Sequence, residues 1–479
     1  MAAPDTELAF TSALELAAMI RSRALSPVEL VELYLGRIER LDPVLGSFIT
    51  VAADQARAAA RQAEAEVTRA GVAAEDLPPF HGVPVSVKDL IDTAGIRTTY
   101  ATAAWSQRVP TADAWVIHLL KRAGFIILGK TSTPEFAGGI FTEPAAYGPC
   151  RNPWNTDFTP GGSSGGAGAS QAAGLCAAAL GSDDGGSVRI PSGWCGLFGI
   201  KPARGRVSAA PEPSAPYYTP GPLAHSVADA AAILDVIGQP ASGDGFWAPP
   251  HTGSFLDETG RDPGRLRIAY TTNAADGVTT TAPNRAAVEQ TARTLEGLGH
   301  DLYELEDWPG RGTFPDNRTV GLHVIYGAML AMKIDQGLAP PVESMEFGQQ
   351  ILVALGREVK GTDLLWAQYV QAEASRQIVA AFDDFDVLLT PVVAAGPSRV
   401  GEFVEHPERL LGMLDVVQFT GQWSITGQPA ASVPALLDDD GVPVGIQLVG
   451  RPADEATLIR LSSQLEQAQP WTHRRPAVS

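Results

Sequence analysis

Residues 161–201 are the most informative stretch of the chain and read GGSSGGAGASQAAGLCAAALGSDDGGSVRIPSGWCGLFGIK. Small residues fill positions 167–180, which predicts a helix that lets neighbouring backbones approach closely. Residues 181–201 begin with glycines and end with apolar residues, so they predict a loop that passes into a strand. Glycine pairs stand directly before Ser163 and before Ser187. The stretch therefore holds two serines on glycine-rich loops, one at each end of a predicted helix.

The residues upstream of this stretch carry a different pattern. Valines alternate with other residues over positions 83–88, which predicts a strand that ends at Lys88. Residues 114–123 predict a helix closed by Gly124, and the short apolar run 125–128 predicts a buried strand. A helix followed by a buried strand is typical of an α/β core, so the fold class expected is α/β.

The flanks complete this picture. Ser12 and the pair Ser26-Pro27 begin predicted helices, because both have the composition of helix N-termini. Further strands are predicted at 266–270, 386–390 and 444–449, and further helices at 285–298, 320–338, 345–382 and 455–466. We expect one domain over 1–479, built from an N-terminal helical segment (1–75), a core (76–237), an inserted helical flank that lines a pocket (238–385) and C-terminal core strands with a helix (386–479).

The composition excludes several classes of function. The formal net charge is −19, which repels phosphate backbones and anionic lipids, so nucleic acids and membranes are not expected as partners. The N-terminus shows no signal-peptide pattern, and we expect a cytoplasmic protein. The three cysteines have no metal-binding spacing, so we expect no metal and buried thiols that fill space.

Lys88 is the first candidate for chemistry. A lysine at the end of a valine-rich strand commonly lies at an edge with its amine in water. If the amine is buried instead, its pKa falls and it can act as a base near neutral pH.

The spacing Gly161-x-Ser163-x-Gly165 offers a second candidate, the nucleophile elbow of α/β-hydrolases. An elbow needs a buried strand directly before the serine. The preceding residues 152–157 are rich in asparagine and contain a proline, which is incompatible with a central strand. We therefore reject the elbow.

The third candidate is the run from Asp183 to Ser187. Two glycines before a serine allow successive backbone N–H groups to point into one cavity and form an oxyanion hole, although the same residues also suit a simple tight turn. A serine nucleophile needs a base within hydrogen-bond reach, and the histidines lack motif-like surroundings. A serine–lysine arrangement needs no histidine.

These residues resemble a known family. Residues 161–201 are similar to the long signature of the amidase signature family. The likeness extends over nearly the whole chain and includes the segments 82–89 (GVPVSVKD), 129–135 (GKTSTPE), 151–155 (RNPWN), 426–430 (TGQPA) and 441–450 (GVPVGIQLVG). It implies an α/β/α fold in which a large, mixed, twisted sheet is covered by helices on both faces.

The resemblance also implies roles for individual residues. The nucleophile falls on Ser187, the bridging serine on Ser163 and the base on Lys88, and the peptide bond before Ser163 is expected to be cis. The other implied positions are the oxyanion donors Asp184, Gly185, Gly186 and Ser187 through their backbones, the supporting residues Ser164, Asp183 and Arg189, and a substrate wall at Ala137, Gly138, Gly139 and Ile140. Asp184 departs from the family pattern, and its carboxylate is expected to disfavour anionic substrates.

The resemblance is closest to the 6-aminohexanoate cyclic dimer hydrolase and urethanase-like branch. It implies a cofactor-free hydrolase of small amides, anilides or carbamates, present as a monomer or homodimer. Two alternatives stay open: the glutaminase subunit of a tRNA-dependent amidotransferase, and a scaffold without activity. Aromatic pocket residues are expected among Tyr217, Tyr218, Phe314 and Trp423, each of which also suits ordinary packing.

Overall fold

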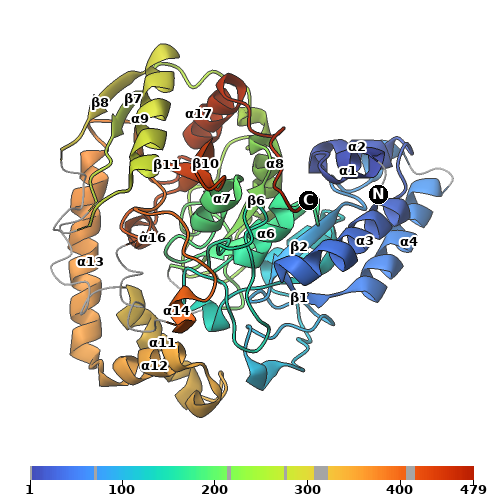
Figure 1. Cartoon of the computed structure of the whole chain (residues 1–479), viewed down its shortest axis with the longest axis horizontal. Coiled ribbons are helices and arrows are strands. Elements are labelled where there is room, and N and C mark those ends of the chain that lie inside the picture. The colour runs from blue at the N-terminus through green and yellow to red at the C-terminus, as the bar shows by residue number, and fades with distance from the viewer. Residues whose placement is uncertain (1–2, 70–72, 213–216, 275–277, 307–321, 406–415) are drawn as a thin grey trace.

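The computed structural model describes residues 3–69, 73–212, 217–274, 278–306, 322–405 and 416–479, and its centre is a mixed sheet of eleven strands (Figure 1). Across the sheet the strands run β1 (Phe48–Val51), β3 (Ile126–Thr131), β2 (Pro84–Lys88), β4 (Ala178–Asp183), β6 (Thr219–Ala224), β5 (Phe198–Lys201), β10 (Ala430–Leu437), β11 (Pro443–Gly450), β9 (Val387–Pro391), β7 (Arg267–Tyr270) and β8 (Asp301–Glu304). β2 is parallel to both β3 and β4, whereas β4, β6, β5, β10, β11 and β9 are antiparallel in succession.

Helices cover both faces of the sheet, as predicted (Figure 1). α17 (Glu455–Ala468) contacts both α8 (Val227–Ile237) and α9 (Ala282–Gly297), and all three helices contact the sheet. α6 (Gly165–Ala172) and α7 (Arg189–Cys195) contact each other and the sheet. Two glycines of β11 allow the helices on the two faces of the sheet to approach the strand closely. A Cβ on Gly445 would lie 2.7 Å from Gly193 of α7, and a Cβ on Gly450 would lie 3.2 Å from Leu458 of α17. Because these two glycines are an odd number of residues apart, they face opposite sides of the strand.

The N-terminal helices are α1 (Ala3–Ala9), α2 (Ala13–Arg21), α3 (Pro27–Leu45) and α4 (Ala53–Thr68), and α5 (Trp115–Arg122) lies further along the chain. Of these, α2 and α3 begin at the serine caps that the sequence predicts. Ser12 Oγ accepts a hydrogen bond from Glu15 N at 3.1 Å, and Ser26 Oγ accepts one from Val28 N at 3.0 Å. Each bond satisfies a backbone donor that the first turn of a helix leaves free.

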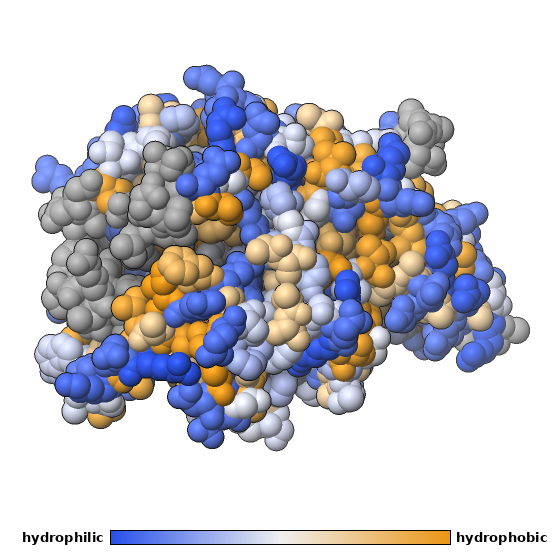
Figure 2. Space-filling model, turned by 60° about the horizontal axis from the view of Figure 1, so that its bottom comes forward, coloured by the Kyte–Doolittle hydropathy of each residue, from blue (hydrophilic) through white to orange (hydrophobic). Residues whose placement is uncertain are grey.

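A helical flank lies between β8 and β9. It contains α11 (Leu322–Asp335), α12 (Phe347–Glu358) and α13 (Gly361–Ala381), and the shorter helices α14 (Glu402–Glu405) and α16 (Gly421–Thr426) follow β9. α11 and α12 cross where Gly327 meets Gly356, since a Cβ on Gly356 would lie 2.2 Å from the Gly327 carbonyl carbon. α11 and α12 come forward in Figure 2, where apolar side chains gather on the surface. Exposed apolar residues of α12 include Phe347, Ile351 and Leu355.

Two predictions in the signature stretch are wrong. The predicted helix over 167–180 ends at Ala172, because Gly174 has a φ of +63° and turns the chain into the central strand β4. The predicted loop in 181–201 contains the buried helix α7. Alanine-rich residues suit both a helix and a crowded strand, and the sheet decides between them.

Sequence analysis did not predict β6, because the segment contains prolines. Pro220 and Pro222 lie within the strand, although proline is excluded from strands that are paired on both sides. β5 pairs with β6 only at Leu223 and Ala224, so Pro220 and Pro222 lie outside the pairing between β5 and β6. The backbone N–H groups that these two prolines lack are therefore not needed for that pairing.

Three further findings concern the described residues. All three cysteines are buried, which confirms their prediction as space-filling side chains. No helix in the described ranges combines the length and the apolar character needed to cross a membrane. Within the same ranges, no three or more His, Cys, Asp or Glu side chains gather as potential metal ligands.

Candidate active site

The sheet brings Lys88 and the run from Asp183 to Ser187, the first and third candidates, to the same end of two neighbouring strands. β2 ends at Lys88, and its parallel neighbour β4 ends at Asp183, with Val87 paired to Leu180. Parallel strands end at the same edge of a sheet, so the residues at their carboxyl ends lie side by side. The α/β topology thereby places Lys88 next to the loop that carries Ser187.

A chain of hydrogen bonds connects the three predicted catalytic residues. Lys88 Nζ lies 2.7 Å from Ser163 Oγ, and Ser163 Oγ lies 3.0 Å from Ser187 Oγ. Ser163 stands on the turn into α6, and the Gly162–Ser163 peptide bond is cis, as expected. No strand precedes Ser163 in residues 159–162, which agrees with the rejection of the nucleophile elbow. The three side chains are therefore within reach of proton transfer from one to the next.

Lys88 is fully buried, and its strand lies in the interior of the sheet with partners on both sides. Burial lowers the pKa of Lys88 to about 7, although the nearby carboxylates of Asp184 and Asp183 oppose the shift. A low-dielectric environment disfavours the ammonium form, so a substantial fraction of the amine is uncharged at neutral pH. An uncharged amine can accept a proton from the serine hydroxyl beside it.

Ser182 is a site residue that sequence analysis missed. Its hydroxyl and carbonyl oxygens accept hydrogen bonds from Lys88 Nζ at 3.1 and 3.4 Å. Ser164 completes the arrangement, because its hydroxyl donates to Ser182 O at 3.1 Å and accepts from Ser182 N at 3.2 Å. These contacts fix the position of the amine relative to Ser163. Ser182 lies in the informative stretch directly before Asp183, but no motif marks it, and the strand that carries it was not predicted.

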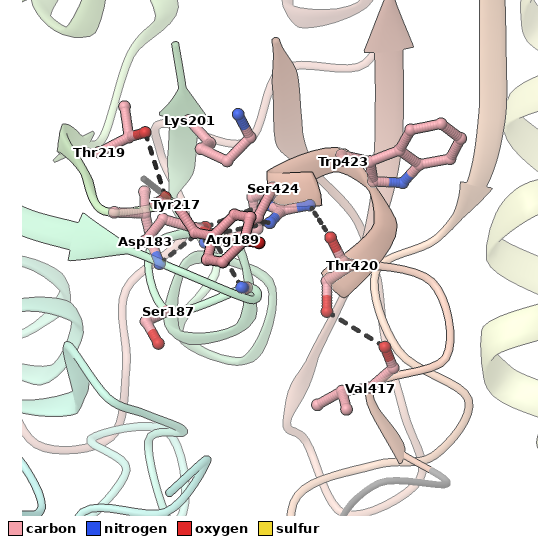
Figure 3. Close-up of polar contacts among 12 residues, drawn as sticks. Asp183, Ser187, Arg189, Lys201, Tyr217, Thr219, Val417, Thr420, Trp423 and Ser424 are labelled. Atoms are coloured by element: carbon pink, nitrogen blue, oxygen red, sulfur yellow. Dashed lines mark hydrogen bonds and ion pairs between the residues drawn. The ribbon is translucent and has the colours of Figure 1, made fainter. Parts of the chain in front are cut away.

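Asp183 and Arg189 brace the loop that carries Ser187. Both side chains are fully buried, and Arg189 Nη2 lies 2.7 Å from Asp183 Oδ1. Arg189 Nη1 donates to Thr420 O at 2.9 Å and to Gln447 Oε1 at 2.8 Å, which ties the loop to β11 and to the start of α16. Figure 3 shows Arg189 between Asp183 and Thr420, with the Ser187 side chain pointing away from this ion pair.

The same ion pair sets the charge of the loop. Burial would raise the pKa of Asp183, but the positive charge of Arg189 outweighs it and holds the pKa at about 2. Asp183 also accepts hydrogen bonds from the backbone of Gly186 at 2.8 Å and of Val188 at 3.1 Å. The carboxylate is thus a permanent anion around which the loop is folded.

The loop amides differ in one respect from the expectation. The Gly186 amide donates to Asp183 Oδ1, so it is already occupied and is not a free oxyanion donor here. No described residue accepts a hydrogen bond from the N–H groups of Asp184, Gly185 or Ser187. These three amides remain available for an oxyanion.

The predicted substrate wall lies beside the bridging serine. A Cβ on Gly162 would lie 2.8 Å from the Ile140 carbonyl carbon and 3.0 Å from Gly139 O, so the wall packs directly against the turn before Ser163. Ala137 has a φ of +64° and Gly138 follows it at the end of a short 3-10 turn. A methyl group on Gly138 would collide with the Gln349 side chain.

The helical flank holds this wall in place. Tyr326 of α11 donates a hydrogen bond to Phe136 O, and Gln349 Nε2 of α12 donates to Glu135 O at 2.9 Å. Both helices therefore contact the segment that leads into Ala137. Sequence analysis gave no indication of Gln349, which carries no motif.

The predicted pocket aromatics have different environments. Tyr217 donates its hydroxyl to Gln371 at 2.5 Å, and Tyr218 is half-buried with Asp184 near its hydroxyl. Trp423 is fully buried and packs against Phe382, so it belongs to the core and is not a pocket wall. The predicted residue Phe314 lies outside the described residues.

A separate cleft of about 610 Å³ opens elsewhere on the molecule. Its lining includes Arg206, Trp247, His251 and Phe255, and none of the candidate catalytic residues. The candidate site at the ends of β2 and β4 is therefore distinct from this cleft.

Comparison with known proteins identifies the family to which the chain belongs. The amidase family model matches residues 29–459. The putative amidase AmiB2 of Mycobacterium tuberculosis (strain ATCC 25618 / H37Rv) is 40% identical over 485 residues, which cover 99% of each chain. One subunit of the glutamyl-tRNA(Gln) amidotransferase of Synechococcus sp. (strain CC9311) is 34% identical, covering 95% of this chain and 97% of its own.

The solved structures include one with the same architecture. The structure of 6-aminohexanoate cyclic dimer hydrolase complexed with substrate is 30% identical and superposes with a TM-score of 0.89, covering 98% of this chain and 100% of its own. This likeness falls on the branch that the sequence resembles. With the family model spanning most of its length, the chain belongs to the amidase signature family.

Proposed function

We propose that the protein is a serine-dependent amidase that hydrolyses small amides, anilides or carbamates through an acyl-enzyme on Ser187. The observation that carries this proposal is the chain Lys88–Ser163–Ser187, with distances of 2.7 and 3.0 Å between successive side-chain atoms. A buried amine with a depressed pKa and a hydroxyl between it and the nucleophile form a complete path for one proton.

In the proposed acylation, Ser187 Oγ attacks the substrate carbonyl while its proton passes to Ser163 and the Ser163 proton passes to Lys88. The carbonyl π electrons move to oxygen. When the C–N bond breaks, the nitrogen takes a proton back through the same two groups and leaves as an amine. Water then attacks the acyl ester, and its proton passes through Ser163 to Lys88. When the bond between the acyl carbon and Ser187 Oγ breaks, Lys88 returns this proton through Ser163 to Ser187 Oγ, which releases the acid and restores the nucleophile. Every proton taken up by Lys88 is returned, so the cycle needs only water.

The developing oxyanion is held by the backbone. The amides of Asp184, Gly185 and Ser187 are free in the described part of the chain, and they belong to the loop that Asp183 and Arg189 brace. Removal of one oxyanion donor costs about 10²–10³ in rate in enzymes of this chemistry. A rigid loop matters because such donors stabilise charge only when they are already oriented.

Amide, anilide and carbamate carbonyls pass through the same tetrahedral intermediate, so one site can serve all three. The likeness to 6-aminohexanoate cyclic dimer hydrolase supports an amide as substrate. Within this class of substrates, we propose hydrolysis of carbamates (urethanes) and of esters in addition to amides.

The direct test is replacement of the nucleophile. Ser187→Ala is expected to abolish hydrolysis of anilides and aryl carbamates, and to abolish labelling by a fluorophosphonate probe, while the circular-dichroism spectrum stays unchanged. Ser344→Ala, at an exposed serine of the helical flank, serves as the control and is expected to keep both activity and labelling. Hydrolysis at wild-type rate by the Ser187→Ala protein would refute the proposal.

A second candidate is the glutaminase subunit of a tRNA-dependent amidotransferase, favoured by the 34% identity to one component of such an enzyme. That function predicts glutamine hydrolysis that depends on an added partner protein. Hydrolysis of anilides or carbamates by the isolated chain, without glutaminase activity, distinguishes the amidase from this candidate.

A further inference from the structure

Asp184 lies three residues before the candidate nucleophile Ser187, and one oxygen of its carboxylate has no hydrogen-bond partner among the described residues. Its Oδ1 atom is completely buried and accepts no hydrogen bond from any described residue. After burial, Asp184 has the largest effect of the charges that act on the pKa of Lys88, and its charge adds to the effect of burial in raising the pKa of Tyr218 and of Tyr326. A buried acceptor without a donor costs free energy, so such an atom is retained in a site when something else supplies the donor.

The other charges around the site are balanced. Asp183 forms its ion pair with Arg189, and Glu212 forms one with Lys333. Lys88 Nζ donates to Ser163 and Ser182, not to Asp184. Within the described ranges, Asp184 is therefore the carboxylate of this site that lacks a compensating hydrogen bond or ion pair.

Burial raises the pKa of Asp184 to about 6, although the charge of Lys88 opposes this shift. The group is consequently ionised in mildly alkaline buffer, where Lys88 is mostly uncharged. Under these conditions the site adjacent to the nucleophile carries a net negative charge. A site of this kind favours a ligand that brings a positive donor and rejects one that cannot fill it.

We propose that Asp184 is a specificity-determining residue that binds a protonated amine of the substrate near the scissile carbonyl. The substrate class is then an amide or anilide that carries an ammonium group, such as an aminoacyl anilide. This inference rests on the proposed function, because it places the ammonium next to the carbonyl that Ser187 attacks. It also explains why a carboxylate is compatible with this position: the substrate completes its hydrogen bonding.

The test compares matched substrates at pH 8. One pair is 4-aminobutyryl 4-nitroanilide and pentanoyl 4-nitroanilide, and a second pair is glycyl 4-nitroanilide and propionyl 4-nitroanilide. A third pair carries the ammonium or a methyl group on the leaving amine. We expect the wild type to favour the cationic member of at least one pair by about tenfold or more in kcat/KM, the ratio that a hydrogen bond to a charged group provides.

Asp184→Asn is expected to reduce that ratio to about one. Because the ratio compares two substrates of the same enzyme, it does not depend on any change in the overall rate that the substitution causes. Asp439→Asn, at an exposed carboxylate remote from the site, changes the net charge equally and is expected to leave the ratio unchanged. Asp184→Thr provides a second variant with a shorter, uncharged side chain, should the asparagine variant fold poorly.

The outcomes separate this inference from the function on which it rests. If the wild type favours no cationic substrate, or if the preference persists in both Asp184 variants, the role of Asp184 is refuted although Ser187-dependent hydrolysis remains. If the preference for the cationic substrate is lost in the Asp184 variants and kept in Asp439→Asn, the proposed role of Asp184 is supported. Activity that survives Ser187→Ala refutes the catalytic proposal instead, so each failure has its own signature.

Discussion

Replacement of Lys88 by methionine tests the central element of the site, because it removes the amine and keeps the length of the side chain. Burial lowers the pKa of Lys88 from its usual 10.5 to about 7. At pH 7 roughly half of the amine is then uncharged, against about 0.03% for a lysine of ordinary pKa, so the fold supplies about three orders of magnitude more free base. Loss of a positioned general base costs about 10²–10⁴ in rate, and we expect a decrease of this size in Lys88→Met.

The assay is the pH dependence of kcat/KM for an anilide between pH 5 and 9. Since the uncharged amine is the active form, the wild-type rate falls as pH decreases through about 7 and reaches about one hundredth of its plateau at pH 5. Lys88→Met is expected to lose this decrease together with most of its activity.

Lys201 provides a matched control. It is also buried with a pKa lowered to about 7 by burial, but its Nζ donates to Pro202 O at 2.9 Å and forms no hydrogen bond with Ser163 or Ser187. Lys201→Met is expected to keep the decrease near pH 7. If Lys88→Met retains both the wild-type rate and that decrease, Lys88 is not the base and the reasoning from burial to proton transfer is wrong.

Three further predictions concern the scaffold of the site. Asp183→Asn leaves the buried Arg189 charge uncompensated, so we expect a loss of about 3–5 kcal/mol in the free energy of unfolding by urea at pH 7, together with loss of activity. Because the native pKa of Asp183 is depressed, the stabilisation by its carboxylate is complete above about pH 4 and disappears as pH falls toward 2. An Asp183→Asn protein as stable as the wild type at pH 7 would contradict this prediction. Gly445→Ala places a methyl group 2.7 Å from Gly193 Cα, so we expect a lower thermal midpoint than for the exposed control Gly245→Ala. Equal midpoints for the two variants would contradict the close contact between β11 and α7. Trp423→Ala empties a core position and is expected to cost about 3–5 kcal/mol, whereas a change in substrate preference without loss of stability would return Trp423 to the pocket.

Short-range patterns predicted a large part of the molecule. The serine caps at the starts of α2 and α3 act within three residues of chain, so local sequence was sufficient to place them. The spacing of Ser163 and Ser187 and the strand that ends at Lys88 indicated a serine–lysine site and the α/β class. Each of these signals depends on residues that are close in sequence and on side chains that have few alternative uses.

The assignments that failed depended on neighbours distant in sequence. The alanine-rich residues after Gly174 form β4 because β2 and β6 supply hydrogen-bonding partners on both sides, and no local preference reports that. Trp423 is of a residue type that commonly lines pockets, but its packing against Phe382 places it in the core.

The sequence by itself therefore indicated the candidate nucleophile, bridging hydroxyl and amine, because residue type and motif identify such groups. Tertiary structure alone decided their electrostatic state. Lys88 is fully buried at the end of its strand with Ser182 beside its amine, the Gly186 amide is taken by Asp183, and Asp184 Oδ1 has no donor in the described part of the chain. Charge and hydrogen bonding depend on the atoms that surround a group in space, and those atoms come from strands and loops that only folding brings together.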